Sequence, residues 1–413
     1  MDFAYTKEEI QFRDELRAWL EANVPTEWQE QGGGMLGGTD EQFQFLVDWQ
    51  RKLYDAGWGA VHWPKEYGGR DATLIEQLIY QQEMARIQAP PQVNLLGIGL
   101  VGPTLIAIGT EEQKKKYLSK ILSGEEIWCQ GYSEPGAGSD VASLSTKAVK
   151  KGDHWEINGQ KIWTSLAHKA DRCFLLTRTN YYEKKHKGIT VFLVDMHQPG
   201  VEARPIHQIS DTADFNEVFF TNAVAYDEDI VGQIDDGWRI TLLLLSFERV
   251  SIGGLGNQLE NQLKGMLELA RTHTRGGVPL IEDPLVRDQL AQFHISIQAE
   301  KFHFYRNMTE QLRTGLPSIR GSMDKLFSSE LGKAMGAYAL GSLLGQEGTL
   351  WRDQNAQALT NIWINPYLFS FAMTIAGGTS EIQRNIISEQ MLGLPKDIKT
   401  WTPPKTEAEA VQS

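Results

Sequence analysis

Apolar residues recur at helical spacing through the first 124 residues of the chain. In residues 40–56 the apolar positions on one helical face include Phe43, Leu46, Val47, Leu53 and Tyr54. Similar patterns predict helices over 6–24, 74–87, 94–108 and 111–122. The glycine-rich segment 31–38 and the aromatic segment 57–69 are expected to be loops. Residues 1–124 are therefore predicted to form a helical domain.

The pattern changes near residue 126, where short alternating runs and turn dipeptides replace the helical period. Residues 154–164 place Asn158-Gly159 between two such runs, and this dipeptide is typical of a tight hairpin turn. Alternating segments continue to about residue 230. We therefore expect a β domain over residues 125–235, with a hairpin at Asn158-Gly159.

From Gly237 the helical period returns. The main segments predicted as helices are 238–270, 284–314, 321–344 and 382–392. Residues 236–400 are expected to form a helical bundle, and the Pro-, Glu- and Ala-rich residues 401–413 a loose tail. The fold class is therefore predicted to be α+β, with the order helical, β, helical.

The net charge of −13 gives no overall field for nucleic acid or an anionic membrane surface. The longest strongly apolar run, 242–245, is far shorter than the roughly 20 residues that span a bilayer. The N-terminus lacks the basic and apolar blocks of a secretory signal, so a cytoplasmic protein is expected. Cys129 and Cys173 lack metal-ligand or disulfide spacing, and we expect them to be small buried residues.

Two glycine-rich segments are candidates for ligand binding. GYSEPGAGSD, residues 131–140, lies where the helical pattern gives way to the β pattern. Its glycines allow close backbone approach to a flavin or phosphate, although an ordinary Gly/Pro turn explains the composition equally well. Gly378-Thr379-Ser380 precedes a helical segment, and a helix start can bind an anion.

These segments, together with NGQKIWTS, GWRITLLLLSFER and GGTSEIQRNIISEQMLGLP, resemble the acyl-CoA dehydrogenases in order and spacing, over roughly residues 5–395. The resemblance implies a helical N-terminal domain, a β-barrel middle domain and a C-terminal four-helix bundle, with FAD between the last two. It implies α,β-desaturation of an acyl-CoA thioester and electron-transferring flavoprotein as the electron acceptor. A flavin oxidase on the same scaffold is a rival interpretation.

The resemblance also implies roles for individual residues. Trp163 would cover one face of the flavin ring, whereas without the motif it would be interpreted as a core aromatic residue. Ser165 would bond flavin N5, and Ser139 would lie near both the FAD pyrophosphate and the CoA arm. The remaining residues implied to contact FAD are Gln130, Tyr132, Ser133, Thr379 and Glu381.

Most of these enzymes carry the catalytic Glu at the position of Gly377. A minority, including isovaleryl-CoA and long-chain types, carry it at the position of Glu248, which shares a helical stripe with leucines. Poor solvation there would raise the pKa of the carboxyl and suit it to act as a base. Glu248 is therefore the predicted base, with the Gly377 N–H as donor to the thioester carbonyl. The alternative is a solvated acid beside Arg249, a residue that the resemblance places near the loop 376–379 or the CoA arm.

Two family motifs that hold the adenosine half of FAD are weak in this chain, at residues 272–277 and 339–345. Arg275 is the candidate substitute. The weakness leaves open a homodimer or homotetramer, a heterotetramer with a related chain, and a non-catalytic subunit that supports FAD in a partner. The C-terminal motif resembles that of relatives acting on branched, dicarboxylic or steroid side-chain esters.

Overall fold

The computed structural model describes residues 5–26, 28, 39–181, 185–252, 255–314, 318–348 and 359–396. Side chains of residues 248–252, 255–257, 346–347 and 359–361 lie outside this description. The predicted loop 31–38 and tail 401–413 also lie outside the described residues.

The N-terminal part is helical, as predicted. Its elements are α1 (Lys7–Asn23), α3 (Asp40–Asp55), α4 (Leu74–Arg86), the π-helical turn Gly97–Val101, α5 (Gly102–Ile108) and α6 (Glu111–Ser123). A threonine caps the N-terminus of α1, α3, α4 and α6, and in each case a Glu or Gln three residues later completes a capping box. These reciprocal hydrogen bonds satisfy two backbone donors and fix where each helix begins.

The middle part is a mixed eight-stranded sheet. Its strands are β1 (Trp128–Gly131), β2 (Lys147–Lys151), β3 (His154–Ser165), β4 (Arg172–Arg178), β5 (Ile189–Asp195), β6 (Val201–Ile206), β7 (Phe215–Ala225) and β8 (Ile230–Val231). The strand order is β6-β7-β3-β2-β4-β5-β8, and β1 pairs in parallel with β4. Cys129 and Cys173 are opposite each other in that pair, and both are free and buried, as expected.

The predicted hairpin at Asn158-Gly159 is wrong. β3 runs through both residues, and the turn of the β2–β3 hairpin is at Gly152-Asp153. Gly159 instead follows a shift in the register between β3 and β7. A Cβ at Gly159 would lie 2.5 Å from the Thr146 hydroxyl, so the glycine provides close packing rather than a turn.

The C-terminal part is a helical bundle. Its elements are α7 (Gly237–Ile252), α8 (Leu255–Thr272), the short strands β9 (Thr274–Arg275) and β10 (Val278–Pro279), α9 (Pro284–Thr314), α10 (Gly321–Tyr338), α11 (Leu359–Ile375) and α12 (Ser380–Ile386). π-Helical turns at Ala339–Leu344 and Ile387–Met391 extend α10 and α12. The predicted segment 238–270 corresponds to α7 and α8, and α11 was not among the predicted helices.

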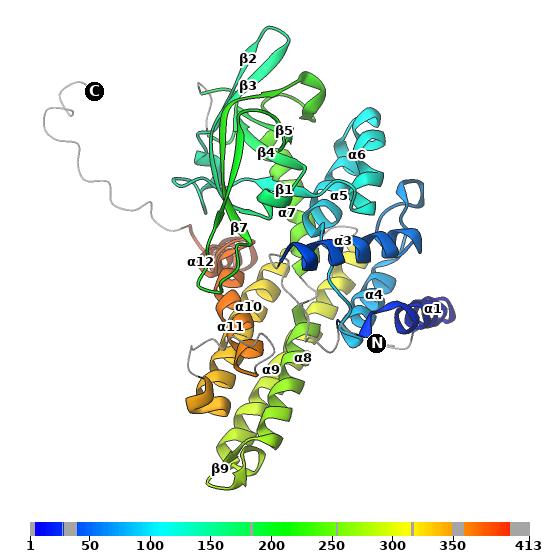
Figure 1. Cartoon of the computed structure of the whole chain (residues 1–413), viewed down its shortest axis with the longest axis vertical. Coiled ribbons are helices and arrows are strands. Elements are labelled where there is room, and N and C mark those ends of the chain that lie inside the picture. Colours follow the sequence, from blue (N-terminus) through cyan, green and yellow to red (C-terminus); the bar gives the residue numbers. More distant parts are fainter. Residues whose placement is uncertain are drawn as a thin grey trace, which may run out of the picture.

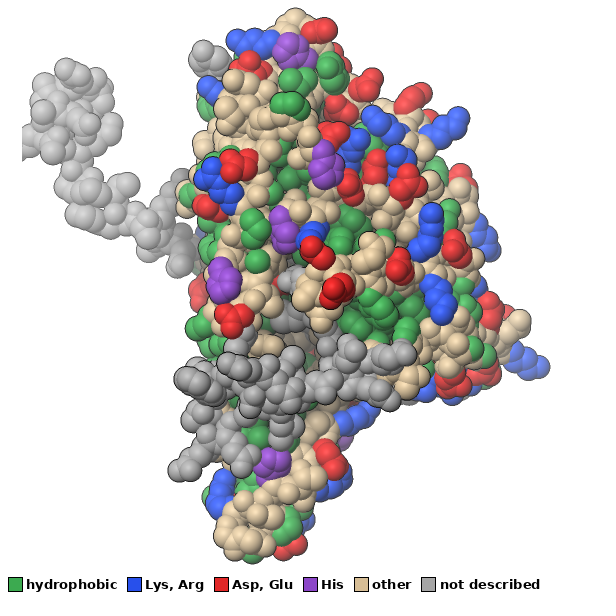
Figure 2. Space-filling model, viewed as in Figure 1, with side chains coloured by type: hydrophobic (Ala, Val, Ile, Leu, Met, Phe, Trp, Pro, Cys, Tyr) green, Lys and Arg blue, Asp and Glu red, His purple; other side chains and the backbone are tan. Residues whose placement is uncertain are grey.

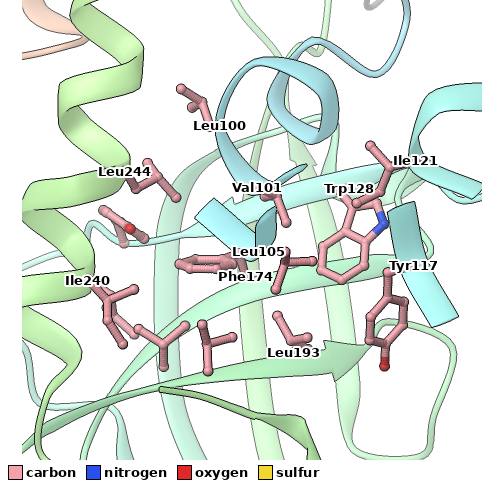
Figure 3. Close-up of a cluster of buried hydrophobic side chains, with 14 of the residues drawn as sticks. Leu100, Val101, Leu105, Tyr117, Ile121, Trp128, Phe174, Leu193, Ile240 and Leu244 are labelled. Carbon is pink, nitrogen blue, oxygen red and sulfur yellow. The ribbon is translucent and has the colours of Figure 1, made fainter. Parts of the chain in front are cut away.

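Two cores position the candidate site. The larger one joins helices α5, α6 and α7 to strands β1, β4 and β5 (Figure 3). Leu244 and Ile240 on α7 are fully buried in it. The second core lies among α8, α9, α10 and α11. The sheet and the α8–α9 tip therefore occupy opposite ends of the long axis, with α10 to α12 between them (Figure 1).

Figure 2 shows how charged side chains are distributed on one face of the molecule. On the face shown in Figure 2, acidic and basic side chains are interspersed among the described residues. Within the described parts of the chain, none of the helices is long and apolar enough to cross a membrane.

Candidate functional site

A buried ion pair holds the glycine-rich loop that follows β1. Lys161 Nζ on β3 donates to Glu134 Oε1 at 2.8 Å and to the carbonyl oxygen of Tyr132 at 3.1 Å. Glu134 also accepts hydrogen bonds from the main-chain N–H groups of Ser145 and Thr146. The carboxylate therefore joins both ends of the loop to β3.

Burial and pairing act in opposite directions on both charges, and burial lowers the pKa of Lys161 although the Glu134 carboxylate opposes that shift. Burial opposes ionisation of Glu134, but the Lys161 ammonium and the hydrogen bonds from residues 145 and 146 outweigh it and lower the pKa of Glu134 to about 2. Lys161 is fully buried. The loop is consequently anchored by an ionised carboxylate at neutral pH.

Trp163 occupies an irregular position at the end of β3. The register between β3 and β7 shifts between Lys161 and Thr164, and the φ of Trp163 is 62°, in the left-handed region. Its side chain is 57% exposed and contacts the ring of Phe215 edge to face. The core interpretation of Trp163 is therefore wrong, and an exposed, strained aromatic residue is more typical of a functional site.

The neighbouring predicted flavin contacts lie around Trp163. Ser133 accepts a hydrogen bond from the Ile162 N–H at 2.9 Å through its carbonyl oxygen, which brings the start of the loop beside the end of β3. Ser165 is half-buried and Ser139 is exposed. Gln130 and Tyr132 flank the β1 end that joins this loop. The structure thus brings Tyr132 and Ser133 beside the end of β3 that carries Trp163 and Ser165, whereas Gln130 lies on β1 and Ser139 on the loop that follows it.

The loop leaves room for a ligand. A Cβ built at Gly136 or Gly138 would meet no atom of the described chain within 4 Å. Packing within the chain therefore does not require these glycines. They leave the loop backbone open to a flat or anionic group approaching from outside, so the residues present fit a flavin nucleotide.

A second part of the candidate site is the turn between α11 and α12. Gly377 and Gly378 have φ values of 65° and 92°. Thr379 caps α12 by accepting a hydrogen bond from the Ile382 N–H. Glu381 is exposed in the first turn of α12, and hydrogen bonds from its own main-chain N–H and the Thr379 side chain lower its pKa.

The predicted base lies on α7. Its position, Glu248, continues the i, i+4 series of the buried residues Ile240 and Leu244. The side chains of Glu248 and Arg249 lie outside the described residues, so their roles remain predictions. Helix α10 contacts α7, which carries Glu248, and also α11 and α12, which flank the Gly377 turn.

Arg275 lies apart from the other predicted residues. It is on β9 at the tip of α8 and α9, at the far end of the molecule from β1 and β3 (Figure 1). Its Nη2 donates to the carbonyl oxygen of Ser342 at 2.9 Å. This contact unites the two weak motifs, 272–277 and 339–345, on one surface. A single chain does not bring them to the Trp163 region.

Sequence reasoning missed three residues that support the site, namely Glu134, Lys161 and Lys325, whereas Gln383 lies in the quoted C-terminal motif. Glu134 and Lys161 lie inside the quoted motifs GYSEPGAGSD and NGQKIWTS. A single charged residue among small and apolar neighbours could have indicated that each has a partner. Lys325 had no such signal, because a lysine in a helix is usually solvated.

The three parts of the chain match known sequence families. The models for the N-terminal, middle and C-terminal domains of acyl-CoA dehydrogenases match residues 6–125, 129–223 and 235–392. Acyl-CoA dehydrogenase IpdE1 of Mycobacterium tuberculosis is 40% identical, over 94% of this chain and 98% of its own length. FadE26 from the same organism is 33% identical, over 96% of this chain and 99% of its own length.

Solved structures agree with these matches. The ChsE4-ChsE5 complex from Mycobacterium tuberculosis contains a chain that is 32% identical, with a TM-score of 0.83, covering 96% of this chain and 100% of that one. A chain of the Tcur3481-Tcur3483 steroid ACAD is 30% identical, with a TM-score of 0.84, covering 96% of this chain and 100% of that one. The predicted fold class is thereby confirmed, and the chain belongs to the acyl-CoA dehydrogenase family of enzymes.

Proposed function

We propose that this enzyme is an FAD-dependent acyl-CoA dehydrogenase that desaturates the Cα–Cβ bond of a CoA thioester, with Glu248 as the base. The observation that carries the proposal is the pairing of the exposed, left-handed Trp163 with a loop anchored by Glu134 and Lys161. An aromatic wall and fixed main-chain dipoles are what a flavin ring requires of a protein.

Three groups of residues would hold FAD. The flavin ring would lie against Trp163, Ser165 and the start of the loop at Gln130, Tyr132 and Ser133. Ser139 would face the pyrophosphate and the CoA arm, and Thr379 and Glu381 would contact the cofactor from α12. When bound, FAD would accept the β-hydride, and with it both electrons of the oxidation.

Proton removal belongs to the chain itself. Glu248 would take the α-proton as the Cα–H bond breaks and the Cα=Cβ bond forms. The N–H of Gly377 would donate to the thioester carbonyl, where enolate-like charge develops. Gly377 has no side chain, so a base acting from α7 can reach the α-carbon without competition from the loop.

The names of the similar proteins support a proposal for the substrate class. Since a 30% identical neighbour is described as a steroid ACAD, we propose a CoA thioester carried on a steroid side chain or a similarly branched acyl group. Electron-transferring flavoprotein is the proposed acceptor. An oxidase would instead produce peroxide in air, so peroxide release during turnover distinguishes the two activities.

The assembly is proposed to contain at least two chains, because Arg275 is on β9 at the tip of α8 and α9, away from the sheet that carries Trp163 (Figure 1). Two neighbouring structures are heteromeric by title, which favours a related partner chain. A purely supporting subunit would supply contacts to FAD, but its flavin absorbance would not fall when a thioester is added.

The deciding experiment is anaerobic titration of the purified protein with a panel of CoA thioesters, with and without Glu248→Gln. We expect the native protein to lose its flavin absorbance and Glu248→Gln to retain bound FAD without reduction. Glu268→Gln, an exposed acid on α8, is the matched control. Reduction of Glu248→Gln at the native rate would refute the assignment of the base.

A further inference from the structure

The turn between α11 and α12 contains two successive residues that lack a side chain. Gly377 and Gly378 both adopt left-handed φ values, and glycine has more backbone freedom than any other residue. A main-chain donor in such a segment stabilises charge only if its direction is fixed before the reaction. The remainder of the chain must therefore hold this turn.

Two buried side chains do so from the bundle side. Gln383 Nε2 donates to the carbonyl oxygen of Gly377 at 2.7 Å, and Lys325 Nζ donates to the carbonyl oxygen of Gly378 at 2.7 Å. Gln383 is 3% exposed and Lys325 2% exposed. In addition, the Ser380 hydroxyl donates to Glu330 on α10 at 2.7 Å, which fixes the start of α12. Helix α10 is therefore the platform beneath the turn.

These contacts determine where the N–H groups point. In a trans peptide the carbonyl and the following N–H point in opposite directions. With their carbonyls bound to Gln383 and Lys325, the two peptides direct the N–H groups of Gly378 and Thr379 away from those side chains. The contact on the Gly377 carbonyl also restricts rotation about its Cα–C bond. Among the described residues, no acceptor is found for the Gly377 N–H.

We infer that Lys325 and Gln383 are positioning residues for the desaturation, holding the Gly377 turn so that its N–H is ready for the thioester oxygen. This inference rests on the proposed function. The Lys325 ammonium lies on the carbonyl side of the turn, and its positive charge adds to the field that favours negative charge at the N–H side. Lys325 and Gln383 thus restrict the motion of the turn, and Lys325 adds an electrostatic field, whereas the turn itself contributes only main-chain groups.

The test uses acetoacetyl-CoA, whose acidic α-hydrogen lets it bind as an enolate without turnover. An enolate beside oxidised flavin gives a long-wavelength absorption band, and the pH at which half of the band appears measures enolate stabilisation. We expect Lys325→Met to raise that pH by about one unit, equivalent to about tenfold weaker stabilisation, with FAD still bound. Lys301→Met, a lysine of α9 paired with Glu260, should leave it unchanged.

Gln383→Asn provides an independent test, because it keeps the amide but is one methylene too short to reach the Gly377 carbonyl. It should shift the band in the same direction even if Lys325→Met fails to retain FAD. A normal band in Gln383→Asn, or in flavin-loaded Lys325→Met, would overturn the positioning role alone. Absence of the band in the native protein, with no thioester bleaching its flavin, would overturn the proposed function and this inference together.

Discussion

At the scale of single residues, Trp163 shows how a site departs from local preference. A large aromatic side chain is normally buried, and a left-handed φ normally belongs to Gly or Asn. Trp163 violates both rules, with 57% exposure and a φ of 62°. The left-handed backbone and the exposed ring both lower stability, which is consistent with a role in ligand binding. The sequence motif predicted this role, whereas the strand pattern alone predicted a core residue.

Trp163→Asn should therefore separate stability from cofactor binding. Asn tolerates the left-handed region, so the FAD-free protein should gain about 0.5–1 kcal/mol in the free energy of unfolding. Loss of aromatic contact should weaken FAD binding about 2- to 10-fold. Urea unfolding and flavin fluorescence titration measure the two effects. Tyr226→Ala, at an exposed aromatic residue directly after β7, should affect neither by a comparable amount. Equal FAD affinity in Trp163→Asn would contradict the role.

Glu300 on α9 gives a prediction about pH. It is 3% exposed, and burial, opposed by a hydrogen bond from Ser328 and supported by nearby Asp324, raises its pKa to about 7. Because the folded pKa exceeds the unfolded one, its stabilising contribution is present below pH 4.5 and is lost as pH rises through 7.

Glu300→Gln should remove the loss of stability that Glu300 causes as pH rises, because Gln does not ionise. At pH 8 the variant should be more stable than the native protein by roughly 2 kcal/mol, and at pH 4.5 the difference should disappear. Chemical unfolding at the two pH values measures this. An equal difference at both would show that Glu300 does not titrate in this range, and Glu268→Gln again serves as an exposed control.

At the scale of elements, β3 carries the anchor for the glycine-rich loop. Breaking a buried ion pair leaves one charge without its partner. Glu134→Gln or Lys161→Met alone should therefore lower the free energy of unfolding by about 3–5 kcal/mol. The double variant should lose less than the sum of the two. A double-mutant cycle by urea unfolding measures the coupling, and strict additivity would contradict a direct interaction.

The elements differed in how readily the sequence revealed them. α9 was predicted with the observed bounds, Pro284–Thr314, because its apolar stripe is periodic and Pro and Thr mark its ends. α11 was missed because it is apolar on all sides and contains Pro366. The hairpin prediction at Asn158-Gly159 was wrong because Gly159 allows close packing against Thr146 and does not form a turn. For the site, residues of the motifs could be named in advance, whereas the role of Lys325 depends on a contact from α10 to Gly378, which is distant in the sequence.

At the scale of the whole molecule, β9, which carries Arg275, lies at the α8–α9 tip, away from the sheet and from α12 (Figure 1). Arg275 pairs there with Ser342 and Asp283 on an exposed tip. We expect Arg275→Ala to leave the unfolding of the chain within about 0.5 kcal/mol of native, because the site is exposed. It should weaken FAD binding in the assembled oligomer.

Light scattering combined with flavin absorbance tests this expectation. FAD content should fall with dilution of the protein, since each cofactor would be held by two chains. A monomer that binds FAD tightly, with Arg275→Ala indistinguishable from native, would contradict it. Restoration of FAD binding only on coexpression with a related chain would identify a heteromeric assembly.

The shared core among α5, α7 and β4 has a consequence for excision of fragments. Trp128, Phe174 and Leu193 of the sheet are covered by helices from both flanking parts of the sequence (Figure 3). A polypeptide cut out at residues 125–235 would expose this apolar surface to water and aggregate. The sheet is therefore not an independent folding unit, and it needs the helices on both sides of it in the sequence.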